Sequence, residues 1–535
     1  MNETVVRHRP VGDSVVAGVA TGAAPHPLDA VLRPASIAII GASPDPTKRG
    51  HRAVQALVSS GYRGRIVPVH PAGGELCGLR VARNPADAEG APDLVLVCTP
   101  ASTVPAVLAE WGEAGARGAV VLASGFGESG EAGAHIEAEV VAVARRTGIR
   151  VVGPNTSGVL NVPIGLNLIG LEGVTAGPLA VLVQSGNMAL ALVTEAARTG
   201  TGFSFVIGVG NESDIGFHEY LDFLAADPGT SGILVHAEGF RDGRSFLAAA
   251  ARASRIKPVI VLKGGRTGLG GTAARSHTGA VAGSYDVFRS GVRQAGAMEV
   301  LRSDELLPVL TTLVQQPPVR SASGIVVLSD GGGQATIAAD DLHARNIQLA
   351  ELSVATGKDL RALLGPAAAV GNPVDLAGAA DRDPLVFARA LEIIARDPAT
   401  AGVLVVGLFG GYAIRFAASL LEREIEAAQE LSRIARAAGV PLVLHTLYAG
   451  TRSEPIRILQ REGVPVIESL EIACRCAAAA VERGRAVAHV RSPATDWPAG
   501  DHAVPSGSPG SAASAGTDRH AGDLHSPHPE PDAFT

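Results

Sequence analysis

Short, uninterrupted apolar runs alternate along the chain with longer stretches in which apolar residues recur every three or four positions. The runs predict parallel β-strands buried on both faces, and the longer stretches predict amphipathic helices. In the first part of the chain we expect strands at residues 36–41, 65–69, 93–98, 118–122 and 150–152, and helices at 54–60, 104–114 and 136–147. This alternation predicts a Rossmann-type, doubly wound α/β domain over residues 28–155.

The same alternation starts again at Leu179 and once more at Gly324. The second set of expected strands lies at residues 179–183, 203–209, 232–236, 258–262 and 297–301, and the third at 324–328, 347–352, 402–406, 441–446 and 464–467. We therefore predict two further doubly wound parallel-sheet domains, at residues 156–316 and 320–485, joined by a Pro- and Ser-rich linker.

The two ends of the chain lack this pattern. Residues 1–27 mix Gly, Ala, Pro and Val without a period, and we expect a flexible leader there. Residues 486–535 are rich in Pro, Ser, Gly and His and contain almost no branched apolar side chains beyond Ser492. Such a segment cannot bury enough surface to offset its ordering entropy, so it is predicted to be a disordered tail.

Composition narrows the classes of function. Of the 535 residues, 46% are hydrophobic but only 4% aromatic, and the formal net charge is −7, which argues against binding to nucleic acid or anionic membranes. The four cysteines form no CxxC pair, so no metal site is expected. The chain shows no signal-peptide core and no apolar run of the ~20 residues that span a bilayer. We expect a soluble, cytoplasmic protein.

The segment at residues 263–283, KGGRTGLGGTAARSHTGAVAG, is the strongest candidate for chemistry. It follows an apolar strand, and its glycines predict a mobile loop. Its candidate hinges are Gly264, Gly265, Gly270 and Gly271. A histidine on such a loop is placed to accept and pass on a phosphoryl group, which makes His277 a candidate nucleophile. The alternative is a loop histidine that only forms local hydrogen bonds.

Neighbouring strand ends supply groups that suit this chemistry. Ser185, Gly186 and Asn187 lie at the start of a predicted helix, where free N–H groups bind phosphate. The alternative is an ordinary helix cap at Ser185 or Asn187, which does not exclude a bound phosphate. Glu238 ends another strand and is expected to orient His277 and strengthen the imidazole as a nucleophile; otherwise it is a surface acid.

The first domain carries a turn suited to a phosphorylated ligand. Gly41 and Ser43 end its first strand, and Lys48 follows closely with a positive charge. The spacing is not GxGxxG, and the second strand ends without an acid for the ribose hydroxyls, so NAD fits poorly. Coenzyme A or a nucleotide with a phosphorylated ribose fits better. The same crevice is expected to be lined by Pro71, Thr99 and Pro100.

These motifs together resemble the nucleoside-diphosphate-forming acyl-CoA synthetases, which include ADP-forming acetate–CoA ligases and succinyl-CoA synthetases. The resemblance covers residues 28–480. SHTGAVAG around His277 resembles the family's phosphohistidine motif, which assigns Ser276, Thr278 and Gly279 to phosphate binding. Other matching stretches are GPN ending at Asn155, QSG at 184–186, GNE at 210–212 and NPVD at 372–375. The resemblance implies that the first domain binds CoA, with Asn155 among its contacts, and that the second and third domains are flavodoxin-like ligase domains.

The resemblance also implies a reversible relay. Acyl-CoA reacts with phosphate to give an acyl phosphate and CoA; the acyl phosphate phosphorylates the histidine and releases the acid; ADP then takes the phosphoryl group as ATP. The chain departs from the family at Thr156, where Cys is common, and in the acidic segment at 329–334. It also lacks the ATP-grasp module that holds Mg-ADP or ATP. Either an ATP-grasp β-type subunit supplies that module or the ligase activity is lost, and a hetero-oligomer or a homodimer is expected.

Two alternatives stay open at this point. One is a non-catalytic CoA or acyl-CoA sensor that has kept the binding pocket and lost the ligase activity. The other, which the missing GxGxxG spacing disfavours, is an NAD-linked oxidoreductase. A sensor has no need of a mobile nucleophile, so His277 with its glycine-rich surroundings favours the ligase.

Overall fold

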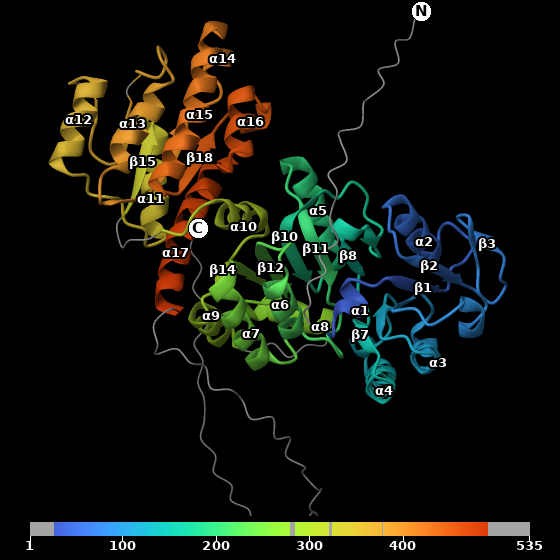
Figure 1. The fold of residues 1–535 in the computed structure, drawn as a ribbon. Helices are drawn as coiled ribbons and strands as arrows, with labels where there is room; N and C mark the ends of the chain where they lie inside the picture. The colour runs from blue at the N-terminus through green and yellow to red at the C-terminus, as the bar shows by residue number, and fades with distance from the viewer. Residues whose placement is uncertain (1–25, 279–283, 320–323, 367, 377, 491–535) are drawn as a thin grey trace, which may run out of the picture. The chain divides into compact units, whose positions relative to one another are not determined.

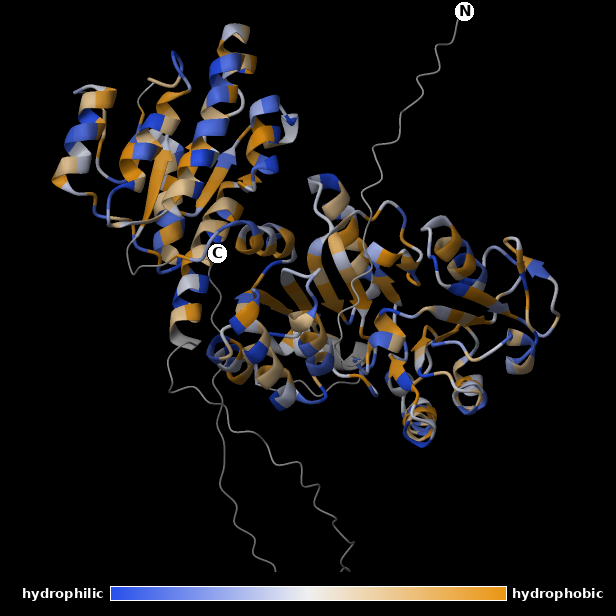
Figure 2. Ribbon diagram, in the orientation of Figure 1, coloured by the Kyte–Doolittle hydropathy of each residue, from blue (hydrophilic) through white to orange (hydrophobic). Residues whose placement is uncertain are grey.

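The computed structural model describes residues 26–278, 284–319, 324–366, 368–376 and 378–490, without the side chains of residues 274–278 and 489–490. Three sheets of mainly parallel strands follow one another along this part of the chain, and helices cover them (Figure 1). The strands are mainly hydrophobic, whereas the helices mix hydrophilic and hydrophobic residues (Figure 2). The α/β class is confirmed; the predicted leader up to residue 25 and the tail from residue 491 lie outside the described residues.

The first sheet has five parallel strands in the order β2-β1-β5-β6-β7. A parallel bridge between Val69 and Ala82 adds a short segment beside β2, which gives the 3-2-1-4-5-6 order of a Rossmann fold. The strands are β1 (Ser36–Ile40), β2 (Arg65–Val69), β5 (Leu94–Val97), β6 (Gly118–Val121) and β7 (Arg150–Val152), with a small antiparallel pair, β3 (Glu75–Leu76) and β4 (Leu79–Arg80). The helices are α1 (Asp29–Leu32), α2 (Arg49–Ser59), α3 (Val104–Glu113) and α4 (Glu131–Thr147), with short 3₁₀ turns η1 (Pro85–Ala88), η2 (Ala101–Thr103) and η3 (Gly127–Ser129). All five predicted strands are present.

The second sheet has seven strands in the order β14-β13-β12-β10-β11-β8-β9. Its parallel strands are β10 (Ala176–Val183), β11 (Phe203–Gly208), β12 (Gly232–Ala237), β13 (Val259–Lys263) and β14 (Met298–Val300). Its helices are α5 (Gly186–Thr199), α6 (Phe217–Ala226), α7 (Gly243–Ile256), α8 (Gly268–Thr278), α9 (Tyr285–Gln294) and α10 (Leu306–Gln315). The antiparallel β8 (Val159–Asn161) and β9 (Leu166–Asn167) were not predicted, because strands of two or three residues are too short to show a period.

The third sheet has the order β16-β15-β17-β18-β19, which is the same 2-1-3-4-5 topology as the five parallel strands of the second sheet. Its strands are β15 (Gly324–Ser329), β16 (Val374–Asp375), β17 (Thr400–Gly407), β18 (Leu442–Thr446) and β19 (Val466–Ile467). Its helices are α11 (Gly332–Ala344), α12 (Val354–Leu364), α13 (Val386–Ala395), α14 (Tyr412–Arg415), α15 (Leu421–Ala438), α16 (Glu454–Arg461) and α17 (Leu470–Val490). The flavodoxin-like fold expected for the second and third domains is confirmed.

The strand predicted at residues 347–352 is wrong. That segment makes only one bridge to the sheet, between Leu349 and Ile325. The Asn372 amide explains why, since its Oδ1 accepts from Val327 N at 3.0 Å and its Nδ2 donates to the carbonyl oxygens of Ile325 and Ala350 at 2.8 and 3.1 Å. Asn372 thus occupies the edge of β15, and β16 forms the second strand instead.

The predicted start of the tail at residue 486 is also wrong, because α17 continues to Val490. Its last part contains Arg485, Ala486 and Ala488, which are good helix formers, whereas the change in composition begins only at Ser492. α17 packs against both α10 and α11, and one apolar cluster joins the second and third sheets across these helices. Another cluster joins the first and second sheets.

Candidate functional site

The predicted nucleophile lies on a helix rather than on a loop. α8 covers residues 268–278, so Gly270 and Gly271 lie inside it, and only Gly264 and Gly265 belong to the turn after β13. The many glycines suggested a loop because each disfavours a helix by about 1 kcal/mol. The missed signal is Thr267, whose Oγ1 accepts a hydrogen bond from Gly270 N at 3.1 Å and so caps the helix.

His277 lies in the last turn of α8, in the part whose side chains are not described, as do Ser276 and Thr278; Gly279 lies outside the described residues. The roles predicted for these four residues and for the hinge glycines therefore stay predictions. The helix itself contacts η3 of the first domain. This contact brings the histidine-bearing helix to the carboxyl edge of the first sheet, since η3 follows β6 there.

The residues of the predicted anion cradle lie at the start of α5, directly after β10. Ser185 is the N-cap residue, and its Oγ accepts from Met188 N at 3.4 Å, a long hydrogen bond. Gly186 and Asn187 occupy the first two helical positions, and the first turn of the helix is open to a ligand. Accessible N–H groups and the positive end of the helix dipole suit a phosphate at this position.

The end of β12 lies beside this cradle, because β12 pairs with β10. Gln184, the residue before Ser185, holds the backbone at the end of β12 through its side-chain amide. Its Oε1 accepts from Glu238 N at 2.6 Å and from Gly239 N at 3.2 Å, and its Nε2 donates to Gly239 O at 3.0 Å. Glu238 is thereby fixed next to the turn that begins α5.

The other side of Glu238 faces the turn into α8, because β12 also pairs with β13. The ammonium group of Lys263, the last residue of β13, donates to the carbonyl oxygens of Glu238 and Gly264 at 2.5 Å each. A Cβ on Gly264 would lie 3.2 Å from Glu238 Cγ, so a glycine at this position gives the carboxylate side chain room. Three neighbouring turns, at the ends of β10, β12 and β13, thus carry the cradle, Glu238 and the entry to α8.

A polar network from the first domain reaches the same edge of the second sheet. Asn211, which follows β11, donates from Nδ2 to Glu128 Oε2 at 2.6 Å and to Glu137 Oε2 at 2.9 Å. Its Oδ1 is 3.4 Å from Asn155 Nδ2, which follows β7. Burial alone would raise the pKa of Glu128, but hydrogen bonds from Asn211 and from backbone amides of its own loop hold it below the usual value. The ionised carboxylates therefore fix Asn211 beside Asn155.

The turn predicted to bind CoA is built for close backbone approach. Gly41 adopts φ +86°, and a Cβ on Gly50 of α2 would lie 2.1 Å from the Gly41 carbonyl oxygen. Only a glycine at residue 50 therefore lets the start of α2 approach the turn. Strands β2, β1 and β5 are neighbours, so the residues predicted at their ends lie along one edge, namely Gly41, Ser43, Lys48, Pro71, Thr99 and Pro100.

The structure separates the two basic residues near this turn. Lys48 is exposed at the N-cap position of α2, where a ligand phosphate can reach it. Arg49 instead donates from Nη1 to the Leu122 carbonyl oxygen at 2.7 Å, at the end of β6. Arg49 therefore ties α2 to the sheet, and Lys48 is the better candidate for a phosphate contact. Thr156, the departure from the family, is buried and bonds to Gly208 O at 2.5 Å, which is a structural role.

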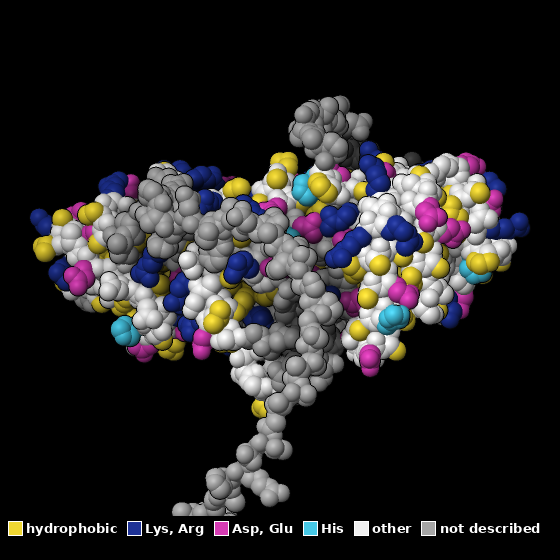
Figure 3. Space-filling model, turned by 90° about the horizontal axis from the view of Figure 1, so that it is seen from below, with side chains coloured by type: hydrophobic (Ala, Val, Ile, Leu, Met, Phe, Trp, Pro, Cys, Tyr) yellow, Lys and Arg dark blue, Asp and Glu magenta, His cyan; other side chains and the backbone are white. Residues whose placement is uncertain are grey.

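On the face of the molecule drawn in Figure 3, basic and acidic side chains are interspersed, and neither charge dominates. None of the helices in the described part of the chain is both long and apolar enough to cross a membrane. Within the same residues, no group of three or more His, Cys, Asp or Glu side chains is arranged to hold a metal ion.

The chain matches two family models, a CoA binding domain at residues 35–161 and a succinyl-CoA ligase like flavodoxin domain at residues 176–313. It is 32% identical over 462 residues to acetate–CoA ligase [ADP-forming] II subunit alpha of Pyrococcus furiosus, covering 86% of this chain and 98% of that protein. It is 34% identical over 380 residues to acetate–CoA ligase [ADP-forming] I of Archaeoglobus fulgidus, covering 71% of this chain and 54% of that protein.

A solved structure is similar over almost its whole length. It is the dinucleotide forming acetyl-coenzyme A synthetase 1 of Ca. Korarchaeum cryptofilum in complex with phosphate and ADP, with a TM-score of 0.78 and 28% sequence identity. The match covers 88% of this chain and 99% of that chain.

Proposed function

The chain belongs to the family of ADP-forming acetate–CoA ligase alpha subunits, and from this premise we propose that it is the CoA-binding, phosphohistidine-carrying subunit of an acyl-CoA ligase. The overall reaction converts acyl-CoA, phosphate and ADP to a carboxylic acid, CoA and ATP, and it is reversible. The observation that carries the proposal is that the cradle, Glu238 and the entry to α8 occupy three adjacent strand ends of one sheet.

In the first step, a phosphate at the start of α5 attacks the thioester carbonyl carbon of acyl-CoA. The carbon–sulfur bond breaks, and the products are an acyl phosphate and the CoA thiolate. Accessible N–H groups at Gly186 and Asn187 neutralise negative charge on phosphate without needing to reorganise during the reaction. Asn155, held by Asn211, lies on the side from which the first domain delivers the thioester.

In the second step, an imidazole nitrogen of His277 attacks the phosphorus of the acyl phosphate, and the carboxylate leaves. Glu238 accepts a hydrogen bond from the other ring nitrogen in this proposal, which favours the tautomer that attacks and stabilises the positive charge that develops on the ring. The phosphoryl group then passes from the histidine to ADP, which becomes ATP.

We propose that the nucleotide, as Mg-ADP or ATP, is held by a β-type ATP-grasp subunit. This proposal is supported by how much of each relative the chain covers. It covers 98% of a relative named subunit alpha, but only 54% of a relative named simply as the ligase. The proposal implies a hetero-oligomer in which α8 carries the phosphoryl group between the two sites.

The test is labelling of the purified full chain with [³²P]phosphate and a panel of acyl-CoA thioesters that begins with acetyl-CoA. We expect an acid-labile, base-stable label that is lost in His277→Ala and kept in His135→Ala. His135 is a matched control, because it is an exposed histidine on α4 that pairs with Glu139 of the same helix.

Two results would overturn the proposal. Label of unchanged intensity in His277→Ala would remove the histidine from the pathway. Absence of label with every thioester, combined with tight CoA binding by calorimetry, would leave a CoA-binding regulatory protein instead.

A further inference from the structure

Lys263 is a charged residue in a place where the fold alone does not require one. Lys263 is the last residue of β13, after four apolar residues, and it is only 9% exposed. Burial lowers the pKa of its ammonium group, and the nearby charge of Glu238 raises it in part. A buried ammonium is costly unless its donors are used, and an apolar side chain of similar length would fill the same space without that cost. Its position therefore points to what its hydrogen bonds hold together.

Those hydrogen bonds join two turns. One goes to the carbonyl oxygen of Glu238, at the end of β12, and the other to the carbonyl oxygen of Gly264, in the turn that leads to α8. Because both acceptors are backbone atoms, the ammonium group fixes the path of the chain at both turns.

Gln184 holds Glu238 from the opposite side. Its amide pairs with the peptide groups of Glu238 and Gly239 through three hydrogen bonds. The next residue along the chain is Ser185, the cap of the helix that forms the cradle. Glu238 is therefore held from both neighbouring strands, with the cradle on one side and the entry to α8 on the other.

We propose that Gln184 and Lys263 are positioning residues for phosphoryl transfer, which hold Glu238 between the anion cradle at the start of α5 and the turn that leads to α8. This inference rests on the proposed function. A general base or orienting group works only within hydrogen-bonding reach of its partner, so loss of either clamp slows the transfer and leaves the CoA site of the first domain intact.

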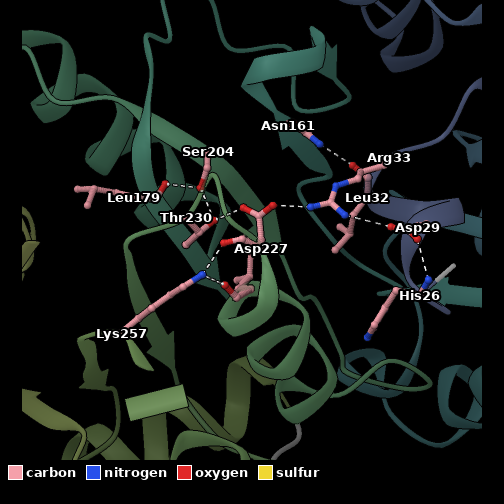
Figure 4. Close-up of polar contacts among 11 residues, drawn as sticks. His26, Asp29, Leu32, Arg33, Asn161, Leu179, Ser204, Asp227, Thr230 and Lys257 are labelled. Carbon is pink, nitrogen blue, oxygen red and sulfur yellow. Dashed lines mark hydrogen bonds and ion pairs between the residues drawn. The ribbon is translucent and has the colours of Figure 1, made fainter. Parts of the chain in front are cut away.

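The structure offers a matched control in Lys257. This lysine lies just before the other end of β13, and its ammonium group also donates to two backbone carbonyl oxygens, those of Leu224 and Asp227 (Figure 4). Burial lowers its pKa as well, and a carboxylate, that of Asp227, raises it in part. Lys257 thus has the same kind of surroundings as Lys263, at the edge of the sheet away from the cradle.

The experiment compares Lys263→Met, Gln184→Leu and Lys257→Met in the full chain. The readouts are the single-turnover rate of histidine labelling from acyl-CoA and [³²P]phosphate, the CoA dissociation constant and the melting temperature. We expect the labelling rate to fall about 10- to 100-fold in Lys263→Met and Gln184→Leu, with the CoA constant changed less than about twofold. Lys257→Met lowers the melting temperature but keeps the labelling rate of the wild type within about twofold.

A double-mutant cycle distinguishes positioning from mere destabilisation. If Lys263 acts through Glu238, then Lys263→Met adds little to the loss already caused by Glu238→Gln. Provided that the wild type is labelled, three results would each overturn the inference. They are fully additive losses of labelling rate in the double mutant, a wild-type labelling rate in Lys263→Met, and an equal loss of labelling rate in Lys257→Met. Failure of the wild-type chain to become labelled with any of the thioesters would instead overturn the proposed function.

Discussion

At the scale of single residues, the predicted CoA turn depends on Gly50. A Cβ there would lie 2.1 Å from the Gly41 carbonyl oxygen, which is part of the backbone and cannot rotate away. In Gly50→Ala, α2 must shift, and we expect a stability loss of about 1–3 kcal/mol and at least a tenfold weaker affinity for CoA. Calorimetric CoA titration and thermal melting check both effects. Gly243→Ala, at an exposed helix start with open space around it, is the control and is expected to leave CoA binding unchanged.

Individual site residues differ in how far the sequence could predict them. Ser185 was predicted as a cap or a phosphate ligand, and the structure places it as the N-cap of α5, because capping is a local property of a few consecutive residues. The amide of Gln184 and the ammonium of Lys263 were not predicted. Their partners lie on neighbouring strands, 54 residues away for Glu238 and Gln184 and 25 for Glu238 and Lys263. Such contacts depend on strand order and register, which local patterns do not contain.

At the scale of elements, the first turn of α12 is held by the buried carboxylate of Asp397. It accepts from Ser353 N at 2.8 Å and from Thr356 Oγ1 at 2.6 Å. Burial alone would raise the pKa of Asp397, but hydrogen bonds from Thr356, Ser353 and Ala399 lower it to about 2. Because the folded-state pKa is below the unfolded value of 3.8, this group stabilises the fold above pH 4 and loses that contribution as the pH falls toward 2.

Asp397→Asn is therefore expected to lower the free energy of unfolding by about 2 kcal/mol at pH 7, with the difference from the wild type shrinking as the pH falls from 4 toward 2. Denaturant titrations across this pH range measure it. Asp359→Asn, an exposed acid on α12 itself, serves as the control and should change stability little. A deficit for Asp397→Asn that stays constant with pH would show that its hydrogen bonds, and not its charge, matter.

Elements were predicted best where their pattern is long. Each of the five strands predicted in the first domain is present, and three of them contain four or five apolar residues in a row, which form a clear signal. The errors fall where a local pattern meets a competing contact. At residues 347–352 the Asn372 amide occupies the strand edge, and at residues 268–278 the glycines obscured a helix that Thr267 caps. The second error matters most, because it places the predicted nucleophile at the end of a helix.

At the scale of the whole molecule, the first and second domains are joined by a polar cluster around Asp227, which is 7% exposed (Figure 4). Arg33 forms an ion pair with Asp227 and lies 4.6 Å from the centre of the Phe223 ring. Asn161 Nδ2 donates to the carbonyl oxygen of Leu32 at 2.8 Å in the same region. This cluster lies at the amino ends of the strands, so it links the domains without touching the predicted site.

Arg33→Ala removes the ion partner of a buried carboxylate, so we expect a loss of about 1–3 kcal/mol in unfolding free energy. CoA binding and histidine labelling are expected to change less than about twofold. Denaturant titration and the labelling assay measure the two effects. Arg80→Ala breaks an exposed ion pair with Glu89 and is expected to cost less than about 0.5 kcal/mol. Equal losses in both variants would show that the Asp227 cluster is no more than a surface contact.

The last prediction concerns the proposed division of the reaction between this chain and an ATP-grasp subunit. The described residues form three α/β sheets, and the chain covers 98% of a relative named subunit alpha, so we expect the chain alone to complete the steps up to the phosphohistidine. With acyl-CoA, phosphate and Mg-ADP, it should form labelled protein but no ATP. Adding a purified ATP-grasp subunit of an ADP-forming acetate–CoA ligase should discharge the label into ATP, at a rate that saturates with the concentration of the added subunit. A luciferase assay measures the ATP, and His277→Ala must abolish it. Equal ATP formation by the chain alone would mean that it holds the nucleotide itself.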